Sequence, residues 1–261
     1  MAFSANLGFL FTELSLIEGV HAAHAAGFGA IECHFPYATD PRDFKAALAE
    51  TGLPLLGLNT NPGDRAAGDF GLAALTDRIG EARTEIDRAI DYAQAVGAGA
   101  VHVMAGRTDG GAAAEKTFRD NLAYAASEAA RHGVTILIEP INHRNAANYH
   151  LATVEQAALI VDDLGAPNLK IMFDFYHIQI AQGDVITRFR IHLDRVGHVQ
   201  IAAVPDRGEP DSGELNYAYL VGAIREAGYL APIGAEYVPR GADTASGLGW
   251  MKLPWAANDV A

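Results

Sequence analysis

The sequence contains very little cysteine and few basic residues relative to acidic ones. Cys33 is the single cysteine, so no disulfide can form within the chain and nothing calls for an oxidising compartment. Its 19 Lys and Arg residues face 32 Asp and Glu residues, which gives a formal net charge of −13 without any Lys/Arg cluster. Proteins that bind nucleic acids or anionic membranes need a basic face to displace counterions from phosphates. We therefore expect neither partner for this chain.

Long apolar runs and linker-like segments are also missing. No run approaches the roughly 20 apolar residues that a transmembrane helix needs. The amino-terminal segment, MAFSANLGFLF, has neither a basic region before an apolar stretch nor a small-residue cleavage site, as a secretory signal would. No Pro/Ser-rich linker or low-complexity block divides the chain. These absences predict one domain over residues 1–261 and a cytoplasmic location, and they leave a homo-oligomer open.

Short apolar runs alternate with longer amphipathic, Ala-rich stretches along the chain. Between Asp77 and Val96, apolar residues recur three, four or seven positions apart, as on one face of a helix. Gly165 and Gly228 follow two further stretches of this kind, where a left-handed helix cap is expected. The runs predict strands at Phe3–Leu7, Ala30–Phe35, Leu55–Asn59, Ala100–Met104, Thr135–Glu139, Lys170–Asp174, His198–Ala202 and Ile233–Tyr237.

This alternation predicts an α/β protein, a single (β/α)₈ TIM barrel. Eight units over 261 residues average about 33 residues each, the size of a βα repeat. Near-continuous apolar strands such as VTILIEP and LKIMFDF suit a parallel sheet that is buried on both faces. The segment Asn61–Thr76 is long for a connection between a strand and a helix, and such loops are often functional. We expect it to cover a site.

Four polar residues end four consecutive expected strands. These residues are Glu139, Asp174, Gln200 and Glu236. Successive members are 35, 26 and 36 residues apart, about one βα unit each. Active sites of this fold lie at the mouth formed by the carboxyl ends of the strands. Three carboxylates and an amide that met there would repel one another unless a cation lay between them. Their oxygen donors favour Mg²⁺ or Mn²⁺ over structural zinc.

An alternative interpretation needs no metal. Each acid could instead cap a neighbouring helix or pair with an arginine of the mouth, where the candidates are Arg107, Arg144 and Arg207. We favour the metal site because the same kind of residue ends four strands in succession.

Two of the carboxylates also suggest a reaction. Strand order places Glu139 and Glu236 on opposite sides of the mouth. A metal bound to the hydroxyl and carbonyl oxygens of a substrate acidifies the carbon-bound proton between them. One carboxylate can remove that proton and the other can return it, through an enediolate that the metal stabilises. This chemistry isomerises or epimerises an α-hydroxy carbonyl compound.

Several strings, in order along the chain, carry a family resemblance: FSANLGFLF, ECHFPY, NPGDRAAGDFGLA, IEPINH, FDFYHIQ, GHVQIA with the following DRGEPDSGELNY, and GAEYVP. They resemble the hydroxypyruvate isomerase family, which belongs to the wider xylose isomerase-like barrel superfamily. The resemblance implies that the four strand-end residues are metal ligands and that Glu139 and Glu236 move the proton. It also implies that His177 and Arg207 contact substrate oxygens.

The resemblance implies interconversion of hydroxypyruvate and tartronate semialdehyde. Sugar 3-epimerases typically have histidine as the third ligand, so Gln200 favours the hydroxypyruvate isomerase branch. The zinc cluster of endonuclease IV needs several histidine ligands, which this ring of four residues does not supply. The substrate carboxylate needs a cation, for which Arg207 is the first candidate, followed by Arg107 and Arg65. A 2-oxo-tetronate isomerase, a ketose 3-epimerase and a barrel that binds a sugar acid without catalysis remain alternatives.

Overall fold

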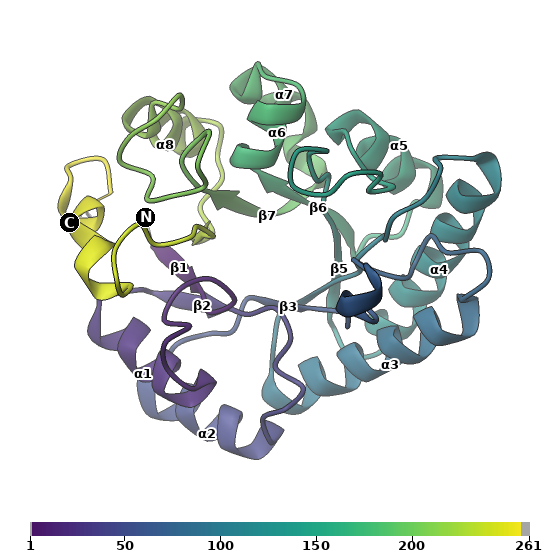
Figure 1. The fold of residues 1–261 in the computed structure, drawn as a ribbon, viewed down its shortest axis with the longest axis horizontal. Helices are drawn as coiled ribbons and strands as arrows, with labels where there is room; N and C mark the ends of the chain where they lie inside the picture. Colours follow the sequence, from purple (N-terminus) through teal and green to yellow (C-terminus); the bar gives the residue numbers. More distant parts are fainter. Residues whose placement is uncertain (1, 257–261) are drawn as a thin grey trace.

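The computed structural model describes residues 2–256, and in it strands and helices alternate around a barrel (Figure 1). The strands surround the centre and the helices pack outside them. The predicted domain, residues 1–261, includes Met1 and residues 257–261, which lie outside the described residues. The strands are β1 (Phe3–Asn6), β2 (Ala30–Glu32), β3 (Gly57–Asn59), β4 (Ala100–His102), β5 (Thr135–Ile138), β6 (Leu169–Asp174), β7 (Val196–Ile201) and β8 (Ile233–Ala235).

The helices begin and end at residues with clear local causes. Gly165 is the left-handed cap of α5, as expected, and Gly228 is left-handed one residue after the cap of α8. One connection differs from the simple repeat, because β6 is followed by two helices separated at the left-handed Gly183. The α-helices are α1 (Leu16–Ala25), α2 (Pro41–Thr51), α3 (Ile79–Val96), α4 (Ala112–Ala130), α5 (Val154–Leu164), α6 (Phe175–Ala181), α7 (Val185–His192) and α8 (Tyr217–Glu226), and the 3₁₀ helices are η1 (Arg65–Ala67), η2 (Leu193–Arg195) and η3 (Ala245–Lys252).

The strands form one parallel sheet that nearly closes on itself. Their order is β2-β1-β8-β7-β6-β5-β4-β3. The remaining seam between β2 and β3 is bridged by the parallel pair Ile31 and Leu55, where the Leu56 amide donates to the Ile31 carbonyl at 2.8 Å. The predicted (β/α)₈ barrel is confirmed.

All eight expected strands are present, with boundaries that differ by at most three residues. The difference arises mainly where apolar residues continue beyond the last ladder pair. Cys33, Met104 and Tyr237 are each at least 95% buried although they lie beyond the last residue of their strands. Burial alone therefore does not mark the end of a strand in this barrel.

The long connection after β3 is an ordered segment rather than a structureless loop. It contains η1, and Gly71 pairs with Ala105 beyond the end of β4. A Cβ at Gly71, whose φ is +110°, would lie 2.6 Å from the Met104 carbonyl oxygen, so this close approach requires glycine. The expected covering segment, Asn61–Thr76, is thus attached directly to the mouth of the barrel.

Below the mouth, the barrel interior is filled by side chains. Ala100, Leu137 and Met172 form a small apolar cluster separate from the main core, which lies between the sheet and the helices. Toward the mouth the interior becomes polar: His198 on β7 is the register partner of Met172, and Gln200, two residues further along the strand, is the register partner of Asp174. Across residues 2–256, none of the helices has the length and apolar character required to cross a bilayer.

Candidate active site

The predicted ring residues gather at the carboxyl ends of β5 to β8. Glu139 and Glu236 directly follow β5 and β8, while Asp174 and Gln200 are register partners on β6 and β7. All four are at least 95% buried. The ligand atoms of the three acids lie within 4.8 Å of one another and of a nitrogen of His177. The structure therefore brings the acids and His177 into one cluster.

Three oxygens of this ring are buried and, within residues 2–256, have no hydrogen-bond partner: Glu139 Oε1, Asp174 Oδ2 and Gln200 Oε1. A buried carboxylate or amide oxygen without a donor is costly, and a group of them indicates a missing positive charge or proton. Oxygen donors of this kind are the ligands of hard divalent cations. The cluster could hold a metal ion.

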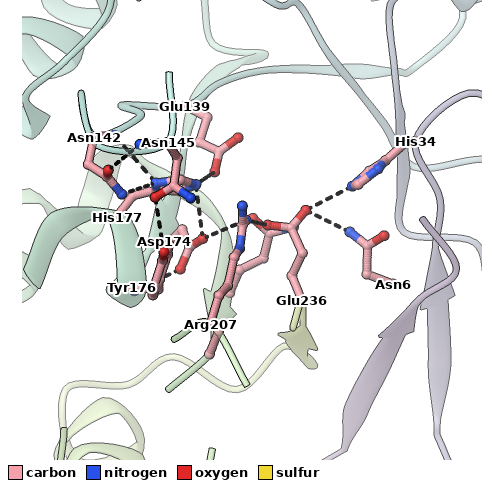
Figure 2. Close-up of polar contacts among 12 residues, drawn as sticks. Asn6, His34, Glu139, Asn142, Asn145, Asp174, Tyr176, His177, Arg207 and Glu236 are labelled. Atoms are coloured by element: carbon pink, nitrogen blue, oxygen red, sulfur yellow. Dashed lines mark hydrogen bonds and ion pairs between the residues drawn. The ribbon is translucent and has the colours of Figure 1, made fainter. Parts of the chain in front are cut away.

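Glu236 is held by donors from three sides (Figure 2). Its Oε1 accepts from Asn6 Nδ2 at 2.9 Å and contacts His34 Nε2 at 3.0 Å, while its Oε2 accepts from Arg207 Nη2 at 2.5 Å. Burial works against ionisation, but the Arg207 charge and the His34 hydrogen bond outweigh it and lower the pKa of Glu236 to about 2. Gly8 makes room for this arrangement, since a Cβ there would lie 2.1 Å from His34 Nδ1.

Glu139 has the opposite environment. Burial, with the negative charges of Glu236 and Asp174, raises its pKa well above the usual range. Burial also raises the pKa of Asp174 to about 7, although Arg207 acts against this. The mouth thus contains more carboxylates than cations, which favours the protonated forms of Glu139 and Asp174. The two carboxylates expected to move a proton have pKa values pushed apart, as in many acid–base pairs.

Asp174 combines a structural contact with a free oxygen. Its Oδ1 accepts from the Tyr176 amide at 2.8 Å and caps α6, which begins at the next residue. Its Oδ2 faces the cluster, 3.5 Å from Arg207 Nη2. Helix capping and arginine pairing, the alternatives to a metal site, are therefore both present, yet they leave oxygens of the ring without a hydrogen bond among the described residues.

The contacts of His177 determine which of its nitrogens carries the proton. The backbone N–H of Asn145 donates to Asn142 Oδ1 at 3.0 Å. The side-chain nitrogen of Asn142, Nδ2, therefore faces His177 Nδ1, at 2.7 Å (Figure 2). Nδ1 must then accept, and because burial lowers the pKa of His177 the neutral ring has its proton on Nε2. That nitrogen lies 3.7 Å from both Glu139 Oε1 and Asp174 Oδ2. His177 therefore offers a hydrogen-bond donor to the cluster.

Arg207 lies between Glu236 and Asp174 (Figure 2). Its guanidinium is enclosed by the rings of Phe9 and Tyr176, with its central carbon 4.7 and 5.0 Å from their centroids. Among the contacts of the described residues, its buried Nε has no partner. Arg207 thus partly neutralises the acids and retains a free donor.

The other arginines considered for the substrate carboxylate are placed differently. Arg65 lines the cavity at the mouth and, within the described part of the chain, makes no ion pair or hydrogen bond through its side chain. Arg107 instead donates to the Gly68 carbonyl at 3.1 Å and lies over Phe70. Arg65 remains a candidate, whereas Arg107 is engaged away from the cavity.

A cavity of about 170 Å³ opens above the cluster. Its polar wall includes Glu139, His177, Arg207 and Glu236, so four of the six predicted site residues line it. The segment predicted to cover a site contributes Pro62, Arg65 and Phe70 to the lining. The apolar part of the wall also includes Phe9, Phe35, Met104 and Ile141.

Polar side chains that line or contact the site also come from the first half of the barrel, outside the four-residue ring predicted from the sequence. Polar residues also end β1 to β4: Asn6, Glu32, Asn59 and His102. His102 is buried in the cavity wall, with neither nitrogen hydrogen-bonded within residues 2–256, and burial lowers its pKa to about 4. The strands predicted from the sequence end instead at Leu7, Phe35, Asn59 and Met104, so the strand-end pattern would have identified Asn59 alone of these four.

Comparisons with known proteins agree with this geometry. The family model for the xylose isomerase-like TIM barrel matches residues 20–253. A 2-oxo-tetronate isomerase from Cupriavidus necator is 45% identical, covering 96% of this chain and 97% of its own length. The hydroxypyruvate isomerase of Escherichia coli is 39% identical over 96% of this chain and 98% of its own. A crystal structure described as an AP endonuclease of family 2 from Brucella melitensis has a TM-score of 0.92 and 41% identity, and covers 96% of this chain and 98% of that one.

Proposed function

We propose a substrate for this chain, which belongs to the xylose isomerase-like TIM barrel family and is an isomerase like its relatives. The proposed reaction interconverts hydroxypyruvate and tartronate semialdehyde by moving a proton between two adjacent carbons. The observation that carries this proposal is the pair Glu139 and Glu236, which line one small cavity and have pKa values shifted in opposite directions.

The reaction needs one proton taken from carbon and one returned to the neighbouring carbon. One of the two glutamates removes a proton from the hydroxymethyl carbon, which leaves an enediolate, and the other delivers a proton to the former ketone carbon. The hydroxyl proton leaves its oxygen while the former ketone oxygen gains one, so that atoms and charge balance. Since the reaction is reversible, each carboxylate is the base in one direction and the acid in the other.

The residues around this pair bind the substrate oxygens. His177 Nε2 is positioned to donate a hydrogen bond to an oxygen on which negative charge develops. Arg207 offers its unpartnered Nε, and its guanidinium is the first candidate for the substrate carboxylate, with Arg65 as the alternative. The apolar rings of the wall limit the access of water to these groups.

Glu139, Asp174, Gln200 and Glu236 are the residues that would hold a metal ion. A divalent cation bound there would supply positive charge that stabilises the enediolate. The all-oxygen donor set supports Mg²⁺ or Mn²⁺, because both prefer carboxylate and carbonyl ligands.

The size of the cavity bears on the substrate. About 170 Å³ is well below the roughly 300–1,000 Å³ of pockets that enclose drug-sized ligands, which favours a substrate with few carbons. A four-carbon 2-oxo-tetronate is the second candidate, because a relative with that name is 45% identical to this chain. A six-carbon ketose is less compatible with this volume.

Substrate preference provides the direct test. We expect kcat/KM to be highest with hydroxypyruvate, lower with 2-oxo-tetronate by roughly 10- to 200-fold, the cost of one misfitted carbon, and lowest with C6 ketoses. Turnover of each compound is followed by NMR at equal enzyme and metal concentration. A preference for the tetronate would select the second candidate, and a preference for a C6 ketose would reject both acids.

Nucleic acid is not part of the proposal, despite the name of the Brucella melitensis structure. The net charge of −13 opposes binding to phosphates. Among the described residues, the ligand-like acids and histidines form one cluster with a single histidine.

Metal binding should release protons. Burial raises the pKa of Asp174 to about 7 and that of Glu139 well above normal, so both groups keep protons at a higher pH than ordinary carboxylates do, and Mn²⁺ must displace those protons. We expect the Mn²⁺ affinity to fall as the pH drops below 7. Calorimetric titration in two buffers of different ionisation enthalpy counts the released protons, and Glu139→Gln should release fewer than the wild type. Equal apparent heats in both buffers would contradict the prediction.

A further inference from the structure

A buried carboxylate lies directly behind the amide of Gln200. Glu32, at the end of β2, is only 3% exposed, and its Oε2 accepts from Gln200 Nε2 at 2.7 Å. The same oxygen lies 3.0 Å from His198 Nε2, and Ser4 Oγ donates to the other oxygen at 3.0 Å. Glu32 is therefore held by residues from β1 and β7 as well as by its own strand.

This contact decides which atom of the Gln200 amide faces away from Glu32. The amide nitrogen is the group that donates in this contact, so it points toward Glu32. The amide oxygen then points away, and Gln200 Oε1 is one of the three buried oxygens at the mouth without a partner among the described residues. Only that orientation presents a lone pair to a cation, because the flipped amide would present two N–H groups.

The barrel provides space for this carboxylate. A Cβ at Gly234 would lie 2.2 Å from Glu32 Oε1 and 2.8 Å from Gln200 Cγ. Gly234 is also the register partner of Gln200 on β8. A side chain there would push Glu32 and Gln200 apart, so the missing side chain at Gly234 is what allows their contact.

We propose that Glu32 is a positioning residue that holds the Gln200 amide with its oxygen toward the cation site. This inference rests on the proposed metal site. Glu32 is not one of the four proposed metal ligands, and it contacts the nitrogen of the Gln200 amide rather than its oxygen. Groups that orient a ligand in this way typically change metal affinity by about 10- to 100-fold when they are replaced.

The test is the affinity for Mn²⁺, measured by calorimetry and by the electron paramagnetic resonance signal of the free ion. Glu32→Gln can form a hydrogen bond in either amide orientation, so Gln200 loses its fixed direction. We expect Mn²⁺ binding to weaken by about 10- to 100-fold. Glu209→Gln is the matched control, since Glu209 is equally buried but pairs with Arg240 outside the cavity lining. Its Mn²⁺ affinity should stay at the wild-type value.

A swapped pair separates positioning from mere structural support. In the double variant Glu32→Gln/Gln200→Glu, both terminal atoms at position 200 are oxygens, so the direction of that side chain no longer matters. The amide introduced at position 32 can donate to the carboxylate introduced at position 200, which restores the contact. We expect the double variant to recover most of the Mn²⁺ affinity that Glu32→Gln loses.

Each outcome has a defined meaning. If the wild type binds no Mn²⁺, the proposed metal site itself fails. If the wild type binds Mn²⁺ and Glu32→Gln binds it equally well, the positioning role alone is wrong. A Glu32→Gln defect that the swapped pair does not rescue also overturns the role, because Glu32 would then serve only the packing of the barrel.

Discussion

Replacing Glu139 or Glu236 with glutamine is expected to lower kcat for hydroxypyruvate by about 10²- to 10⁴-fold, the contribution of a positioned acid or base. The amide has nearly the shape of the carboxylate but cannot take a proton from carbon. Turnover is measured by NMR, together with exchange of the substrate C–H in deuterated water. Glu209→Gln, outside the cavity lining, is the control and should retain activity. Activity near the wild-type level in either variant would remove that residue from proton transfer.

The same two substitutions should affect stability differently. The pKa of Glu139 is raised on folding, so its ionised form destabilises the metal-free protein above the usual carboxylate pKa, and Glu139→Gln should unfold at the same or a higher temperature at pH 8. The pKa of Glu236 is lowered to about 2, so its contribution is present at neutral pH and is lost only as the pH falls through that value. Glu236→Gln should therefore lower Tm. Equal Tm changes would contradict the assigned environments.

Removal of divalent cations is the second change with a large expected effect. Stripping the protein with a chelator should lower turnover by about 10³-fold, because a bound cation supplies several kcal/mol of charge stabilisation. Added Mn²⁺ or Mg²⁺ should restore it. The unpartnered oxygens of Glu139, Asp174 and Gln200 are the physical reason for expecting this dependence. Full activity in the chelated protein would reject the metal site while leaving the carboxylate pair testable.

Metal addition should also stabilise the fold. A ligand at 100 times its Kd that binds only the native state adds about 2.7 kcal/mol of stability. For a chain of this size that shift corresponds to several degrees in Tm. Scanning calorimetry with and without Mn²⁺ measures it, and the variant Gln200→Ala, which lacks one oxygen of the ring, should show a smaller rise.

The part of the site that comes from β5 to β8 could be predicted because each of its acids follows an apolar run that is visible in the sequence. The apolar strands before Glu139 and Asp174 are clear in the sequence, and the parallel topology brings their ends together. The first half has weaker signals. Strands β2, β3 and β4 contain only three residues each, and the predicted strands continue past the ends of β2 and β4, so Glu32 and His102 fall inside predicted strands rather than at their ends.

Other features depend on contacts that no local pattern encodes. The contact between Glu32 and Gln200 joins residues 168 positions apart. The Asn142 side chain fixes the tautomer of His177 only after the loop beyond β5 has folded over α6. Arg207 was expected to contact substrate or to pair with an acid, but no local pattern specifies that it pairs with both Asp174 and Glu236, from a loop in which its own φ is +59°.

The mouth of this barrel is divided between two halves of the chain. The acidic ring comes from the ends of β5 to β8, whereas much of the cavity wall, including Phe9, Phe35, Arg65 and Phe70, follows β1 to β3. The acids and much of the cavity wall therefore come from separate stretches of the chain, although Asn6 and His34 of the first stretch contact Glu236. Substitutions at Phe35 or Phe70 can therefore reshape the cavity wall without replacing any of the acids.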